Sequence, residues 1–206
     1  FGKRDSIHII DLTQTLELTK VALEKVYSTI SSGGKILFIS TKKQASEAIA
    51  DLAKETDQYF VNYRWLGGML TNFSTIRKSL KKLSSLENLE NQDTYTQDFS
   101  KKERLMISRD KEKLERALGG ISSLNRIPAA LFVIDINHED IAVQEAKKLN
   151  IPIYGMVDTN SDPNSINFAI PSNDDSFTSV SLIVDYISEA IAEGLEEREK
   201  MKEELR

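Results

Sequence analysis

Short apolar segments alternate with amphipathic helical segments over much of this chain. Residues 35–40 read as a strand buried on both faces, and a helical pattern follows over 43–55. The rhythm resumes with strands at 130–134 and 153–157, separated by a helix at 139–149. Strands that alternate with helices at this spacing form right-handed crossover units, which build a parallel sheet covered on both faces. The sequence therefore predicts an α/β fold.

Shorter patterns complete the predicted sheet. Residues 59–62 and 168–170 read as short strands, and helical patterns occupy 12–30 and 176–193. We expect a parallel sheet of about five strands, in an order that the spacing alone does not fix.

The segment from Phe73 to Ile121 interrupts this alternation. Apolar residues recur every three or four positions from Phe73 to Leu86, and a second, heavily charged helical pattern covers 101–118. Polar residues 88–100 separate them, which predicts an antiparallel helical hairpin. We therefore divide the chain into an α/β domain (1–72 and 119–195), an inserted hairpin (73–118) and an acidic helical tail (196–206).

Composition narrows the functional class. The chain has 206 residues and no cysteine, so neither disulfides nor thiolate metal sites are expected. No apolar run approaches membrane-spanning length, and no signal-peptide pattern opens the chain. These features fit a cytoplasmic protein without membrane partners. The chain opens at Phe1 without methionine, so we expect a further segment upstream.

The net charge of −5 conceals a strong segregation of charge. Residues 63–86 contain no Asp or Glu, and they hold Arg64, Arg77, Lys78, Lys81 and Lys82. The last four recur at helical spacing opposite the apolar stripe, where they repel one another unless an anion lies alongside. A solvated helix face is the ordinary explanation, but the missing carboxylates favour contact with RNA phosphates.

Two loops add candidate RNA contacts. Thr41, Lys42 and Lys43 lie between a strand and a helix start, where phosphate binds readily, although a helix cap with two solvated lysines explains them equally well. Neither the dinucleotide nor the P-loop fingerprint is present.

The second loop runs from Arg64 to Asn72. Arg64 suits a backbone phosphate, and Thr71 and Asn72 suit neutral contacts. Trp65 can stack on a base, although packing beneath the hairpin is the more ordinary role.

The remaining polar clusters are less specific. Lys101, Lys102, Arg104 and Arg109 alternate with acids on the second hairpin helix, which suits intrahelical pairs and protein docking. Asp158, Asp162, Asp174 and Asp175 suit a hard cation or acid/base work, but turn and cap roles are more ordinary for such residues. His8 and His138 are far apart in sequence, and we assemble no catalytic set. We expect no metal, no cofactor and no small-molecule substrate.

These segments together resemble ribosomal protein S-two. The resemblance rests on residues 34–43, 63–72, 118–121, 130–135 and 151–163, in the family's order, and spans about Ile7 to Ile191. It implies a flavodoxin-like, doubly wound sheet with an inserted hairpin. It also implies a structural, non-enzymatic role in the cytoplasmic small ribosomal subunit, in contact with rRNA, with neighbouring proteins and with protein S-one. The Gly-Val-His-Phe-Gly-His-like string of the family is absent from this sequence.

Two other readings stay open at this point. A small-molecule enzyme would bind a nucleotide or phosphosugar at the strand ends and use Asp158 or Asp174 as acid/base, since a fold does not fix a function. Alternatively, the hairpin is a docking arm for acidic proteins, which is compatible with RNA binding.

Overall fold

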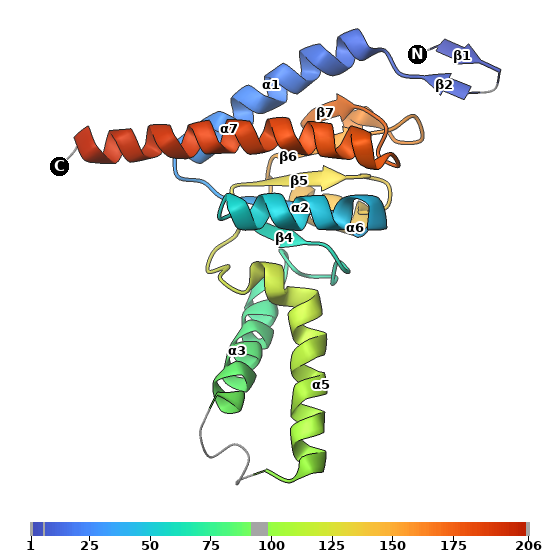
Figure 1. Cartoon of the computed structure of the whole chain (residues 1–206). Coiled ribbons are helices and arrows are strands. Elements are labelled where there is room, and N and C mark those ends of the chain that lie inside the picture. The colour runs from blue at the N-terminus through green and yellow to red at the C-terminus, as the bar shows by residue number, and fades with distance from the viewer. Residues whose placement is uncertain (1, 6, 92–98, 205–206) are drawn as a thin grey trace.

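The protein is built around one parallel sheet, seen in a computed structural model that describes residues 2–5, 7–91 and 99–204 (Figure 1). The strands are β3 (Ile36–Ile39), β4 (Tyr59–Val61), β5 (Ala130–Ile134), β6 (Ile153–Val157) and β7 (Phe168–Pro171). Among the described residues they form one sheet of order β4-β3-β5-β6-β7, with every neighbouring pair parallel. This is the flavodoxin-like order, so the predicted α/β fold and its parallel sheet are confirmed.

One face of the sheet is covered by three helices, α1 (Leu12–Ser31), α2 (Lys43–Glu55) and α7 (Phe177–Glu204). Ile36 and Phe38 of β3 point to this side, where they join a core that includes Val26 and Ile187. Because successive side chains of a strand alternate between faces, the intervening residues of β3 point the other way.

The opposite face is covered by α6 (Asp140–Lys148), by the segment after β4 and by the short 3-10 helix η1 (Gly119–Ile121). Leu37 and Ile39 join this second core, together with Trp65 and Leu70. A second 3-10 helix, η2 (Pro163–Ser165), lies between β6 and β7. Strands buried on both faces explain why their sequences read as continuous apolar runs.

Helices α3 (Phe73–Glu90) and α5 (Lys101–Leu118) form the predicted hairpin, which projects away from the sheet in Figure 1. Ile76 and Leu80 of α3 pack with Leu118 in the second core, which anchors the base of the hairpin. Helix α5 begins with a capping box between Ser100 and Glu103. Most of the predicted polar turn, residues 92–98, lies outside the described residues.

Both ends of the chain depart from the prediction. A two-stranded hairpin of β1 (Gly2–Arg4) and β2 (Ile7–Ile9) precedes α1 and was not predicted. Leu16, Leu18 and Val21 belong to the apolar pattern that predicted this helix, yet all three are exposed on α1. Helix α7 continues through residue 204, so most of the predicted acidic tail extends one long helix; residues 205–206 lie outside the described part. No described helix is long and apolar enough to cross a membrane.

Candidate nucleic-acid interface

The segment from Arg64 to Asn72 is held in place by one buried carboxylate, Glu145 of α6. Glu145 accepts hydrogen bonds from Trp65 Nε1 (3.1 Å), from the backbone N–H groups of Gly68 (2.6 Å) and Leu70 (3.0 Å), and from both N–H and hydroxyl of Thr71 (3.0 Å each). Burial by itself would raise the pKa of Glu145, but these donors outweigh it and hold the pKa below its ordinary value. The carboxylate is therefore charged and fixes the loop.

This arrangement decides between the two roles predicted for Trp65. Its side chain is only 7% exposed and packs in the second core, so the face that would stack on a base is covered by protein. Packing is the role that the geometry supports. Thr71 is likewise engaged with Glu145, and the side-chain oxygen of Asn72 accepts hydrogen bonds from the hydroxyls of Ser74 and Thr75. The polar groups of both residues thus organise the start of α3.

Glycine is required at one point of this loop. Gly68 has a φ of +89°, a backbone conformation that side-chain-bearing residues rarely adopt. This turn aims the N–H of Gly68 at Glu145. The glycine pair seen in the sequence therefore serves the shape of the loop, and it leaves Arg64 exposed at the entrance to the hairpin.

The loop of Thr41, Lys42 and Lys43 is less available than we predicted. Lys42 Nζ lies 2.6 Å from Asp135, 2.8 Å from Asp174 and 2.7 Å from Asp175. Burial opposes the charge of Lys42, but the three carboxylates prevail and raise its pKa above the ordinary value.

Thr41 donates from its N–H and its hydroxyl to Glu139, at 2.7 and 2.6 Å. The charge of Lys42 is thus already neutralised from within the protein, which makes Lys42 a weaker candidate for RNA contact than its sequence indicated. Lys43 alone of the three is exposed and has no ion pair with any carboxylate that the structure describes.

The first hairpin helix matches its predicted surface. The side chains of Ile76, Leu80 and Leu83 are buried, whereas the four cations predicted to bind RNA are all exposed on α3: Arg77, Lys78, Lys81 and Lys82. Lys82 lies 4.0 Å from Asp110 of α5, a loose contact between two exposed groups that contributes little. In residues 2–5, 7–91 and 99–204, the other three have no carboxylate within ion-pair distance. Three of these four charges are therefore uncompensated by the carboxylates that the structure describes.

Arg64 and Arg109, which we assigned to different roles, line the same groove. This groove of about 430 Å³ runs between the loop after β4 and helix α5, and Lys113 and Arg116 line it too. Arg116 pairs with Glu112 at 3.0 Å and lies over the ring of Tyr63. With four cations and one carboxylate among its lining residues, this groove at the base of the hairpin carries an excess of positive charge.

The outer part of α5 is mixed in charge, as its sequence predicted. Lys111 pairs with Glu90 of α3 at 2.7 Å and ties the two arms together. Lys101 and Lys102 are exposed, and Arg104 is half-buried with interactions inside the protein. Lys101 and Arg104 border a shallow groove beside Glu90 and Leu105.

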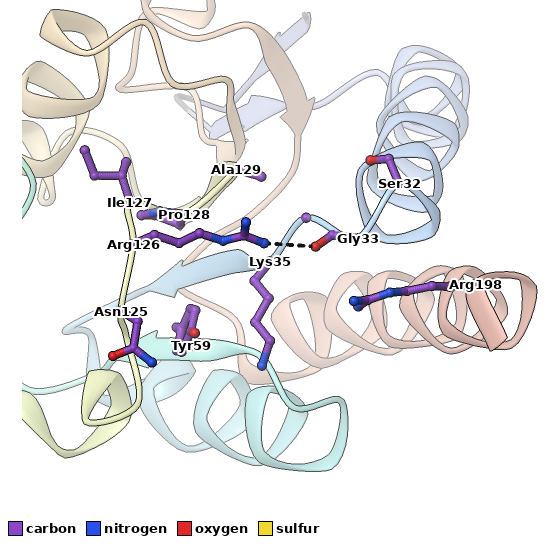
Figure 2. Close-up of a pocket in the computed structure, with 11 residues that line it drawn as sticks. Ser32, Gly33, Lys35, Tyr59, Asn125, Arg126, Ile127, Pro128, Ala129 and Arg198 are labelled. Carbon is purple, nitrogen blue, oxygen red and sulfur yellow. Dashed lines mark hydrogen bonds between the residues drawn. The ribbon is translucent and has the colours of Figure 1, made fainter. Parts of the chain in front are cut away.

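A second cationic concavity lies where the amino ends of β3 and β5 meet, and it escaped the sequence analysis. Lys35, Arg126 and Arg198 line this cavity of about 580 Å³, shown in Figure 2. Lys35 pairs with Asp57 at 2.8 Å, and Arg126 donates to the carbonyl of Gly33 at 3.5 Å. The three cations are remote in sequence, so no local motif signals the cavity.

Comparison with known proteins shows which family this chain resembles. A family model described as Ribosomal protein S2 matches residues 1–194. "Small ribosomal subunit protein uS2" of Cytophaga hutchinsonii is 48% identical over 206 residues, which is all of this chain and 81% of the relative. The protein of that name from Bartonella quintana is 49% identical over 195 residues, 95% of this chain and 75% of the relative. That from Pseudoalteromonas translucida is 48% identical over 196 residues, 95% and 81% respectively.

The family model and the relatives, which match a chain of the expected fold, define a structural ribosomal protein and not an enzyme. The enzyme reading is thereby set aside, and Asp174 is held by Lys42. The chain belongs to the ribosomal protein S2 family, so the resemblance carried by its motifs is confirmed.

Proposed function

We propose that this protein is assembled into the small ribosomal subunit of the cytoplasm, where it binds rRNA through the cationic surface of its hairpin. That surface consists of Arg77, Lys78, Lys81 and Lys82 on α3, continued by the groove of Arg64 and Arg109. The observation that carries the proposal is the exposure of four cations on α3, three of them without a carboxylate partner among the described residues.

Physical chemistry favours a polyanion as the partner of this surface. Like charges at helical spacing repel one another, and a phosphate backbone removes that repulsion while releasing its own counterions. The overall charge of −5 does not oppose this, because charges more than about 10 Å apart are largely screened at ordinary salt. Local charge decides the contact.

Lys43 and the cavity of Lys35, Arg126 and Arg198 offer further phosphate contacts away from the hairpin. They lie at opposite ends of the strands, because Lys43 follows the carboxyl end of β3 while Lys35 precedes its amino end. RNA that touches both must therefore extend along the body of the protein.

The outer part of α5 supports a second, compatible role in protein docking. Lys101 and Lys102 are exposed near the far end of the hairpin, where they can meet acidic surfaces of neighbouring ribosomal proteins, among which we include S-one. Arg104 borders the adjacent groove. We assign Arg109 to the RNA-facing groove instead, because it lines that groove with Arg64.

The proposal is tested by the salt dependence of binding to small-subunit rRNA. Neutralising all four α3 cations (R77Q, K78Q, K81Q, K82Q) removes up to four phosphate contacts, so the slope of log K against log salt should fall by roughly 3. A matched control neutralises four exposed lysines on other helices, namely Lys20, Lys25, Lys147 and Lys148. An equal change of slope in the two variants would overturn the assignment of α3.

A further inference from the structure

Four carboxylates converge on one lysine at the carboxyl ends of the strands. Asp135 follows β5, Asp158 follows β6, and Asp174 and Asp175 follow β7. Lys42, which follows β3, lies within 2.8 Å of Asp135, Asp174 and Asp175. Asp158 joins the group through its Oδ2, which accepts a hydrogen bond from the backbone N–H of Asp174 at 3.3 Å.

One ammonium group does not balance four carboxylates. A fifth carboxylate, that of Glu139, accepts hydrogen bonds from the neighbouring Thr41 and so adds no cation to the cluster. The pocket therefore retains an excess of negative charge in a partly buried place.

One oxygen of this cluster, Oδ2 of Asp174, is buried without compensation in the part of the chain that the structure describes. Asp174 is 1% exposed, and its Oδ1 binds Lys42. Its Oδ2 is also buried, yet it has no hydrogen-bond donor among the residues that the structure describes. A buried acceptor left without a partner destabilises a fold, and the penalty is greater when the acceptor is charged. A ligand that supplies positive charge at this oxygen would remove that penalty.

The geometry suits a hard cation. Asp158, Asp174 and Asp175 each place one carboxylate oxygen within 4.8 Å of the other two. Two oxygens on opposite sides of a calcium ion stand about 5 Å apart, and those around magnesium stand about 4 Å apart. The side chain of Asp175 is 73% exposed, which leaves that side open for water ligands.

We propose that Asp158, Asp174 and Asp175 bind a divalent cation, Mg²⁺ or Ca²⁺, next to the ammonium group of Lys42. The site lies at the carboxyl ends of β6 and β7, on the side of the sheet where open α/β folds hold their ligands. The cation bridges the loop after β6 and the loop after β7. Lys42, in the loop after β3, pairs with Asp135 after β5 and with Asp174 and Asp175 after β7. The bound cation would thus hold these loops together whether or not RNA is bound.

Manganese is a suitable probe for the site, because electron paramagnetic resonance of free Mn²⁺ measures binding to the purified full chain without RNA. We expect a single saturable site with a Kd on the order of 10⁻⁴ to 10⁻³ M, from which Mg²⁺ or Ca²⁺ displaces Mn²⁺. Asp174→Asn should weaken binding by about tenfold or more. Asp158→Asn, at a less buried position, should do the same and serves if Asp174→Asn does not fold.

Asp185→Asn is the matched control, because Asp185 is an exposed carboxylate of α7 outside the cluster. Its Mn²⁺ affinity should equal that of the unaltered chain. The proposal is overturned if the unaltered chain shows no saturable Mn²⁺ binding at millimolar concentrations. It is equally overturned if Asp158→Asn binds Mn²⁺ as tightly as Asp185→Asn does.

Discussion

The indole N–H of Trp65 donates a hydrogen bond to Glu145 Oε1 across 3.1 Å, joining the loop after β4 to helix α6. The two residues are 80 positions apart in sequence, and both are buried. Through this contact and its backbone bonds, Glu145 positions the base of the hairpin and, with it, Arg64. The cationic surface therefore depends on a buried anion.

Replacing Glu145 by Ala should lower the free energy of unfolding by about 3 kcal/mol, because several donors lose a charged acceptor at once. Urea denaturation followed by circular dichroism measures the change. Lys147→Ala, on the exposed side of the same helix, should stay within about 0.5 kcal/mol of the unaltered chain. Similar losses in both variants would show that Glu145 is not an anchor.

Glu145 also gives stability a predictable dependence on pH. Its pKa lies below the ordinary value of 4.5 in the folded protein, so it binds a proton more readily when unfolded. Its contribution is therefore complete above pH 4.5 and is lost as the pH falls through the folded-state pKa. The stability difference between the unaltered chain and Glu145→Gln, measured by thermal unfolding, should shrink on acidification. A constant difference from pH 7 down to about pH 3 would contradict this.

The neighbours Lys42 and Lys43 should respond oppositely to substitution. Lys42→Met removes the counter-charge of Asp135, Asp174 and Asp175, and it should destabilise the fold by about 2–4 kcal/mol. Lys43→Met should leave stability within about 0.5 kcal/mol and weaken RNA binding instead. Chemical denaturation and filter binding separate the two effects. Equal stability of the two variants would place Lys42 on the surface.

More of the fold of this protein than of its candidate site could be predicted from the sequence. Uninterrupted apolar runs such as residues 130–134 are local signals, and the structure confirms them as strands with nearly the predicted bounds. The exposed cations of α3 were also predictable, because helical spacing separates them from Ile76 and Leu80. Both inferences use only neighbouring residues.

The failures arise where contacts join distant segments. The sequence offered Lys42 as a solvated or phosphate-binding lysine, because its carboxylate partners lie in the distant loops after β5 and β7. Packing of Trp65 was the more ordinary expectation, but its hydrogen-bond partner on α6 was not predictable. The cavity of Arg126 and Arg198 also forms only in the folded chain. Leu16 follows a helical period, yet it is exposed, so the period alone does not tell which residues of α1 the fold buries.

Replacing Gly120 by Ala should destabilise the fold. A Cβ atom there would stand 2.2 Å from the carbonyl oxygen of Phe60, so Gly120→Ala must push η1 away from β4. We expect a loss of about 2–3 kcal/mol in unfolding free energy. Gly67→Ala is the control, because nothing lies within 4 Å of the added atom. Thermal unfolding of both variants checks the contrast, and an unaltered melting temperature for Gly120→Ala would refute it.

The most direct test of RNA binding by α3 is the occupancy of the protein in purified small ribosomal subunits. Subunits from cells that express the R77Q, K78Q, K81Q, K82Q variant are sedimented in moderate salt and assayed by quantitative mass spectrometry. We predict that the variant is severalfold depleted from the subunits, while the Lys20, Lys25, Lys147 and Lys148 control stays at full occupancy. Full occupancy of the α3 variant would contradict the proposal that this surface holds the protein on rRNA.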